Sequence, residues 1–260
     1  MNVVLINPLR KHEMQGTIPS LVSRERGCNP PLGLMYLAGY LEKYSPHEVN
    51  IIDADAERLT MLSLSERIRN LKPDVVGVTV MTMTLIDSLD VAETVKAVDR
   101  NIKVVFGGPH IHLFPEETIR FQNVDFLVLG EGEETFKDLL DLLPDKSRLK
   151  SVPGLMFMDE SIIVKTGARP MIDDLNMLPF PTRRKVPYKK YTSILSAGNI
   201  VTTIFTSRGC PYQCSFCNRE HLGKKFRARS SLNVTDELTE CVEMGIKDFL
   251  FYDDTFTIDK

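Results

Sequence analysis

Three cysteines lie close together in the second half of the chain, with the spacing C-x3-C-x2-C. They are Cys210, Cys214 and Cys217, and no fourth cysteine stands nearby. Thiolates are the usual ligands of iron–sulfur clusters, and a [4Fe–4S] cluster has four irons to ligate. Three protein ligands leave one iron open to hold a substrate or a cofactor. The spacing therefore predicts an iron–sulfur site that does chemistry.

A zinc site is the main alternative interpretation of these cysteines. Tetrahedral zinc takes four ligands, and His221, four residues after Cys217, is one candidate for the fourth; Cys241 is the other. Structural disulfides are not expected, because five cysteines are an odd number and nothing indicates export. Cys28 is isolated, and we interpret it as an incidental thiol. The spacing favours the cluster over zinc.

Composition limits the kind of protein this can be. The 260 residues are enough for one large or two medium domains, and a hydrophobic content of 43% supports real cores. No apolar run reaches the 18 residues of a transmembrane helix, so membrane insertion is not expected. The segment 1–8 begins directly with a strand and lacks the basic start of a signal peptide. We expect a cytoplasmic protein, since a reducing compartment preserves thiolates.

Positive charge is concentrated in one part of the sequence. The net charge is −3, yet the stretch between Thr182 and Arg229 has 11 Lys or Arg and one acid, Glu220. Such a stretch attracts anionic cofactor groups, an acidic electron donor or nucleic acid, or else forms a solvated surface. We expect a small-molecule substrate and a reductant protein such as flavodoxin or ferredoxin, and no nucleic acid partner.

The first 145 residues alternate between strand and helix patterns. Alternation of this kind predicts βαβ units and a parallel sheet. Five strands suit a flavodoxin-like, Rossmann-like open α/β sheet, which binds its ligand at the carboxyl ends of the strands. The expected strands are 3–6, 49–52, 75–80, 103–106 and 126–129, and the expected helices are 32–43, 64–71, 85–98 and 133–143.

Glycines and polar residues follow the third, fourth and fifth of these strands. Glycine lets the backbone approach a ligand closely, and helix N-termini that follow it present N–H groups to phosphate. Each glycine taken singly also fits an ordinary turn, but three such ends on one edge predict a ligand site. The residues are Thr82, Gly107, Gly108, His110, Gly130, Glu131 and Gly132.

The remaining residues divide into a linker and a second structural unit. Residues 146–195 contain an expected hairpin, 154–158 with 162–165, and a proline-rich linker. Residues 196–260 then give a strand at 200–206, the cysteine loop, a helix at 232–244 and a strand at 248–252. This order is typical of the start of a βα barrel, with chemistry at the carboxyl end of its first strand. Only one βα unit and a second strand fit, so we expect an incomplete barrel.

The cysteine loop resembles that of the radical S-adenosylmethionine (radical SAM) enzymes. The N-terminal half resembles the cobalamin-binding domain that precedes many radical SAM barrels, so the resemblance covers the whole chain from 1 to 260. It implies a B12-binding domain followed by the first βαβ portion of a partial TIM barrel. The matching residues of the N-terminal half are Asn7-Pro8, Pro30-Pro31-Leu32-Gly33-Leu34, Gly107-Gly108-Pro109-His110 and Gly130-Glu131-Gly132-Glu133.

The same resemblance implies three cofactors: a [4Fe–4S] cluster, SAM and cobalamin. The open iron would chelate SAM, whose reductive cleavage gives a 5′-deoxyadenosyl radical. Phe216 would lie near the adenine of SAM, and Asp253 or Asp254 would accept from its ammonium group. Cobalamin would lie on the glycine-rich sheet edge. No histidine is expected on cobalt, because the chain lacks the D-x-H-x-x-G pattern.

The function that the resemblance implies is radical methyl transfer, or a related rearrangement, on an unknown substrate. A methylthiotransferase is one alternative, but such enzymes carry a second three-cysteine set in the N-terminal domain, where this chain has only Cys28. A non-catalytic cobalamin- or cluster-binding module is another alternative, because the chain ends at Lys260, just after the second barrel strand. SAM cleavage with dithionite distinguishes the enzyme from the module.

Overall fold

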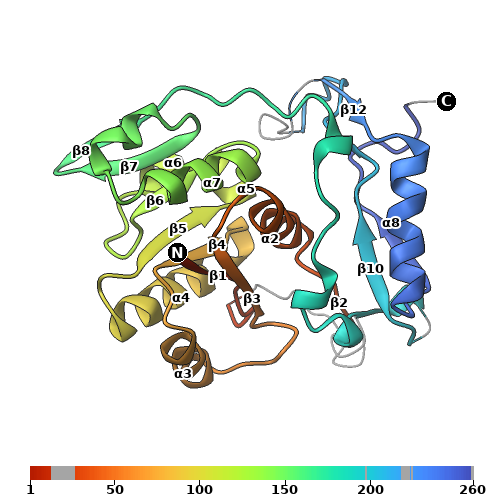
Figure 1. The fold of residues 1–260 in the computed structure, drawn as a ribbon, viewed down its shortest axis with the longest axis horizontal. Coiled ribbons are helices and arrows are strands. Elements are labelled where there is room, and N and C mark those ends of the chain that lie inside the picture. Colours follow the sequence, from red (N-terminus) through yellow and green to blue (C-terminus); the bar gives the residue numbers. More distant parts are fainter. Residues whose placement is uncertain (13–26, 197, 218–222, 224, 259–260) are drawn as a thin grey trace.

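The computed structural model describes residues 1–12, 27–196, 198–217, 223 and 225–258. Its main sheet has seven strands in the order β3-β1-β4-β5-β6-β7-β8 (Figure 1). The first five of these strands pair in parallel, as the sequence predicts, and the α/β fold class is confirmed. The strands are β1 (Asn2–Asn7), β3 (Glu48–Asp53), β4 (Val75–Thr79), β5 (Lys103–Gly107), β6 (Phe126–Val128), β7 (Leu155–Asp159) and β8 (Ile162–Lys165).

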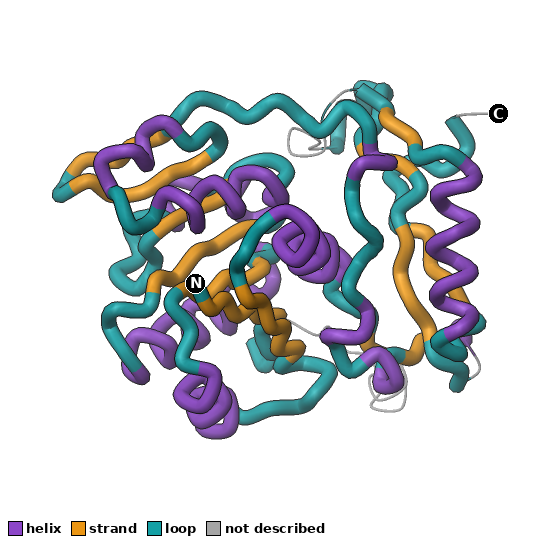
Figure 2. The backbone as a smooth tube through the Cα atoms, viewed as in Figure 1, coloured by secondary structure: helices purple, strands orange, loops and turns teal. Residues whose placement is uncertain are grey.

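Helices cover both faces of this sheet (Figure 2). Alternate residues of β1 separate accordingly: Val3 and Leu5 pack in one core, and Val4 and Ile6 in the other. The first core includes α2 (Leu32–Tyr44) and α7 (Gly132–Leu142); the second includes α3 (Met61–Leu71) and α4 (Leu85–Val98). Burial on both faces explains why the strands are almost continuously apolar in sequence.

The hairpin β7–β8 extends the sheet beyond β6. β7 pairs antiparallel with β6, and Leu155 and Phe157 join one core while Met156 joins the other. The sequence predicts this hairpin and places it with the linker in residues 146–195. Its pairing has a physical reason, because an uncovered β6 would leave unpaired N–H and C=O groups at an edge. The hairpin therefore forms part of the N-terminal sheet.

The C-terminal segment has the expected order of strand, loop, helix and strand. β10 (Val201–Ile204) and β13 (Asp248–Phe251) pair in parallel, and α8 (Ser231–Glu243) connects them. In Figure 1, α2 lies between the main sheet and this segment, and α8 lies on the far side of β10. Two further ribbons, both antiparallel, are β11 (Ser207–Arg208) with β12 (Arg227–Ala228) and β2 (Gly27–Cys28) with β9 (Thr192–Ser193).

Buried polar contacts join the two parts of the chain. The Tyr191 hydroxyl donates to Asp53 Oδ2 at 2.8 Å, and Arg229 Nη1 donates to the Tyr36 hydroxyl at 3.2 Å. Glu237, which is fully buried, forms ion pairs with both Arg183 and Arg229. Charges buried in this way need partners in fixed positions, so these contacts set how the barrel start sits on the sheet.

Among the helices in the described part of the chain, none is both long and apolar enough to span a bilayer.

Candidate functional site

A cavity of about 410 Å³ lies at the carboxyl ends of β4, β5 and β6. One wall is the sheet edge, and the other is the segment that follows β10, just before the cysteine loop. Parallel sheets of this kind place ligands at this edge, and barrel chemistry lies after the first barrel strand. The cavity thus combines both expected ligand positions. Its lining includes Gly107, Gly108, Gly130, Glu131 and Gly132 from the sheet edge, and Phe205, Ser207, Arg208, Tyr252 and Asp254 from the barrel start.

Thr82 and His110 were predicted at this edge but do not line the cavity. His110 is buried, with Nδ1 3.1 Å from Thr82 Oγ1. Burial lowers the pKa of His110, which favours the neutral imidazole. His112, one of two histidines in this turn, does line the cavity. The α5 helix (Pro109–Leu113) directs these two side chains differently, which a sequence pattern does not reveal.

The two glycines that follow β5 have different roles. Gly108 has φ of +103°, and a Cβ there would lie 2.9 Å from the Val80 carbonyl oxygen. The backbone therefore requires glycine at this position. A Cβ on Gly107 would meet nothing closer than 4.0 Å, so a side chain there is sterically possible. Gly107 lines the cavity with its backbone alone, because it has no side chain.

The cavity also has an apolar inner end, between the sheet and helices α2 and α7. Leu5, Leu37, Val105 and Phe136 line this end, together with Gly77 from the middle of β4. A Cβ on Gly77 would lie 2.8 Å from Leu5 Cδ2 and 3.4 Å from the Phe136 ring. The sequence analysis missed Gly77, although a glycine inside a strand is itself a signal of close approach. This end of the cavity is therefore lined mainly by apolar side chains.

The cysteine loop begins and ends at the β11–β12 ribbon. Cys210 is partly buried, with its Sγ 3.3 Å from Thr255 Oγ1, whereas Cys214 and Cys217 are exposed. Zinc–sulfur bonds of about 2.3 Å would require sulfur atoms roughly 3.8 Å apart. The described cysteines form no such set of three within 4.8 Å. Of the two candidates for a fourth zinc ligand, Cys241 is buried, and His221 lies outside the described residues.

The residues predicted to contact SAM occupy three different environments. Phe216 is 90% exposed. Asp253 accepts hydrogen bonds from the Thr206 backbone N–H at 2.7 Å and from the Ser207 hydroxyl at 2.8 Å, so its carboxylate links the segment after β10 to the segment after β13. Asp254 lines the cavity. Of the two predicted carboxylates, Asp254 is thus the one placed at the cavity wall.

Arg208 is a cavity residue that the sequence analysis did not select. Its guanidinium lies over the rings of Tyr36 and Phe205, and it donates to Glu133 at 2.7 Å and to Glu131 at 3.1 Å. Burial on its own lowers the pKa of Arg208, but the two carboxylates raise it above the ordinary value, so the side chain stays charged. The basic stretch in the sequence therefore contributes internal ion pairs as well as surface charge.

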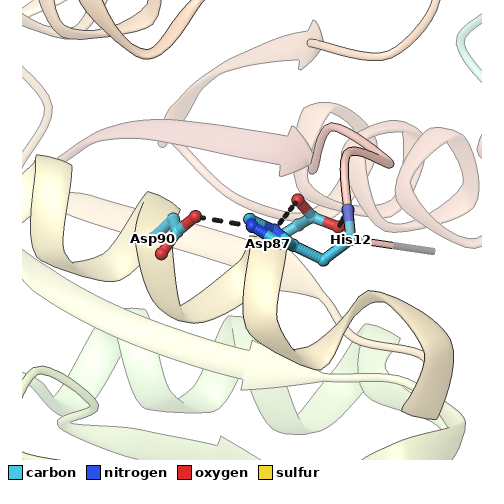
Figure 3. Close-up of side chains that lie close together, drawn as sticks. All are labelled: His12, Asp87 and Asp90. Atoms are coloured by element: carbon cyan, nitrogen blue, oxygen red, sulfur yellow. Dashed lines mark hydrogen bonds and ion pairs between the residues drawn. The ribbon is translucent and has the colours of Figure 1, made fainter. Parts of the chain in front are cut away.

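One group of potential metal ligands lies apart from the cysteines, between the segment that follows β1 and helix α4. Figure 3 shows His12 pointing at Asp87, with Asp90 further along the helix. Buried Asp87 accepts from His12 Nδ1 at 2.9 Å and from the backbone N–H groups of Lys11 and His12 at 3.2 Å each. These bonds hold Lys11 and His12 against helix α4.

Comparison with known proteins supports the cobalamin-binding domain predicted for the N-terminal half. Residues 20–140 match the family described as the B12 binding domain. An uncharacterized methyltransferase of Pyrococcus horikoshii is 39% identical over 89% of this chain and 50% of its own length. An anaerobic magnesium-protoporphyrin IX monomethyl ester cyclase of Cereibacter sphaeroides is 30% identical over 90% of this chain and 39% of its own length. The chain thus spans half or less of these relatives.

Solved structures share the fold across almost the whole chain. The cobalamin-dependent S-adenosylmethionine radical enzyme OxsB, with aqua-cobalamin and S-adenosylmethionine bound, superposes with a TM-score of 0.74 at 22% identity. The match covers 98% of this chain and 34% of that one. The radical S-adenosylmethionine methyltransferase TsrM of Kitasatospora setae gives 0.73 at 21% identity, over 99% and 48%. This chain therefore contains a stretch that matches the B12 binding domain family, and it shares its fold over almost its whole length with these two cobalamin- and SAM-related enzymes.

Proposed function

We propose that this chain binds a [4Fe–4S] cluster, SAM and cobalamin and serves in radical methyl transfer to a small-molecule substrate. The observation that carries the proposal is the shared cavity. The same cavity is lined by the glycine-rich sheet edge of the B12 binding domain and by Arg208, two residues before the first cluster cysteine. Cofactors bound on its two walls would face each other, as methyl transfer between them requires.

The side chains present fit these groups by their chemistry. Three thiolates from Cys210, Cys214 and Cys217 would hold the cluster and leave one iron for SAM. Asp254 at the cavity wall would accept from the SAM ammonium. Gly107 would let a corrin lie close to the backbone. When bound, these cofactors supply a carbon radical and a transferable methyl group, while the chain orients them and excludes water from the apolar inner end.

Cyclisation is a second candidate for the reaction, favoured by the cyclase among the relatives. Methyl transfer is the first because the relative with the higher identity, at 39%, is named as a methyltransferase. The two candidates share the cofactor set and differ in the fate of the substrate radical. Methylthio transfer has no such support, because the sequence before residue 200 contains a single cysteine, Cys28.

A protein reductant and a cytoplasmic location complete the proposal. The cluster needs an electron, and small acidic carriers such as flavodoxin or ferredoxin would supply it. Arg184, Lys189 and Lys190 remain exposed in the linker and would attract such a carrier. Binding should then weaken as ionic strength rises.

Anaerobic reconstitution with iron, sulfide and hydroxocobalamin tests the cofactor assignment. We expect about four irons per chain, a broad iron–sulfur absorption band and the corrin bands in one spectrum. Reduction with dithionite in the presence of SAM should then yield methionine and 5′-deoxyadenosine. A chain that binds both cofactors without cleaving SAM would instead be a binding module. Stoichiometric zinc without an iron–sulfur band would refute the proposal.

Substitution of Gly107 by leucine tests the location of cobalamin. The new side chain should enter the cavity without backbone strain, because nothing lies within 4.0 Å of its Cβ. We expect cobalamin affinity to fall by about tenfold or more, equivalent to about 1.4 kcal/mol, as measured by absorbance titration. Gly167→Leu is the matched control, since a Cβ there meets no atom within 4 Å and Gly167 does not line the cavity. Unchanged affinity in Gly107→Leu would place cobalamin elsewhere.

A further inference from the structure

The cysteine loop closes on a neck that is unstable by itself. The neck is the ribbon of β11 and β12, in which Ser207 lies opposite Ala228 and Arg208 lies opposite Arg227. Two strands of two residues are too short to hold together alone. Two arginines directly opposite each other also repel. The neck therefore depends on a negative charge from another part of the molecule.

Glu131 supplies a negative charge to both arginines with a single carboxylate, whereas Glu133 pairs with Arg208 alone. Its Oε1 accepts from Arg208 Nη1 at 3.1 Å, and its Oε2 accepts from Arg227 Nη1 at 2.9 Å. The backbone N–H of Ile172 donates to the same Oε2 at 2.8 Å. Glu131 itself directly precedes α7, at the sheet edge. One side chain thus connects the sheet edge, both strands of the neck and the linker.

Burial makes this contact energetically important. The Arg227 side chain is 2% exposed, and its Nε and Nη2 have no hydrogen-bond partner among the described residues. Burial alone raises the pKa of Glu131, but the hydrogen bond from Arg227 and the charge of Arg208 bring it below the ordinary value. Glu131 therefore stays ionised at neutral pH. Its removal would leave a buried guanidinium without a counter-charge, which is strongly unfavourable.

We propose that Glu131 is a positioning residue that fixes the cysteine loop relative to the sheet edge. The cobalamin contact expected of Glu131 from its place in the glycine-rich edge stays a separate prediction. Cys210 follows Arg208 by two residues, so the position of the neck sets the position of the first cluster ligand. The inference rests on the proposed function only in taking the cysteine loop as the cluster site.

Hydrogen exchange of the cofactor-free chain tests the structural part of the proposal. Glu131→Gln keeps the shape of the side chain and removes its charge. We expect backbone amides of Ser207–Arg208 and Arg227–Ala228 to exchange about tenfold faster or more, while those of β1 and β4 stay protected. Glu134→Gln is the matched control, because Glu134 lies three residues further on and pairs with Arg169 instead of the neck.

Electron paramagnetic resonance tests the positioning part in the reconstituted chain. Cobalamin is added to Glu131→Gln until an absorbance titration shows saturation. The dipolar coupling between Co(II) and the reduced cluster should change, although each signal alone persists. Glu131→Asp keeps the charge but is one methylene shorter, so we expect it to restore slow exchange only in part.

Three results would overturn the proposal. The first is unchanged exchange at the neck in Glu131→Gln, and the second is unchanged dipolar coupling. The third is a loss of cobalamin affinity with slow exchange retained in the cofactor-free chain, which would make Glu131 a cofactor contact. If the backbone amides of β1 and β4 also exchange faster in Glu131→Gln, the substitution has disturbed the sheet as well. Hydrogen exchange at Arg227–Ala228 is then measured in Arg208→Gln, for which faster exchange is expected and unchanged exchange would contradict the proposal. Exchange needs no cofactor, so failure of the original chain to bind cobalamin would refute only the proposed function.

Discussion

A chain in which Cys210, Cys214 and Cys217 are all replaced by alanine is expected to bind no iron–sulfur cluster. Anaerobic reconstitution of the unaltered chain should give about four irons, and the variant should give none above background. The remaining thiols cannot substitute. Burial and the nearby Asp53 and Asp55 raise the pKa of Cys28 to about 12, and burial raises that of Cys241 to about 11. Both stay protonated at neutral pH, and the thiolate is the form that binds metal.

The control for this experiment is the Cys28→Ala variant, which removes one thiol outside the loop. It should reconstitute with the same iron and sulfide content and the same absorption spectrum as the unaltered chain. Circular dichroism should be identical for all three proteins, because Cys214 and Cys217 are exposed and Cys210 is only partly buried. Iron bound equally by the triple variant would mean that the loop is not the cluster site.

Substitution of Glu237 by glutamine is expected to produce the largest loss of stability. Glu237 on α8 is fully buried between Arg183 of the linker and Arg229. Removing its charge leaves two buried guanidinium groups without a carboxylate. Loss of one partner of a buried ion pair costs about 3–5 kcal/mol. We expect the free energy of unfolding to fall by that amount in urea titrations followed by circular dichroism.

Glu243→Gln provides the comparison for Glu237. Glu243 lies on the same helix but is exposed, so its substitution should change the free energy of unfolding by less than about 0.5 kcal/mol. If the two variants were equally stable, the buried ion pairs would not hold the barrel start in place. The slope of the titration should be similar for both variants, because the surface exposed on unfolding is the same.

The parallel part of the sheet was predictable because each strand is buried on both faces. Burial of this kind leaves short apolar runs, such as 75–80, that stand out between helical patterns. The position of the hairpin β7–β8 was not predictable in the same way. The spacing of apolar residues identifies a strand but does not show which strand it pairs with. The pairing of Phe126 with Phe157 joins residues that are not neighbours in the sequence. The division at residues 145 and 195 stays a prediction.

The candidate site was predictable where local chemistry determines it. Cysteine spacing and strand-end glycines are local signals, and Gly107 and Gly130 do line the cavity. Ion pairs across long sequence separations carry no such signal. Arg208 and Glu131 are 77 residues apart, so the sequence showed a basic stretch and an acidic turn but not their contact. The exposed position of Phe216 likewise depends on how the loop folds.

The position of the cavity between the sheet and the barrel start has a thermodynamic consequence. Its walls come from both parts of the chain, so a ligand that contacts both walls binds only when the two parts are folded and docked. Binding of this kind is linked to folding, and a ligand at 100 times its dissociation constant adds about 2.7 kcal/mol of stability. The docked form would then accumulate in proportion to ligand supply, which makes resistance to proteolysis a measure of cofactor occupancy.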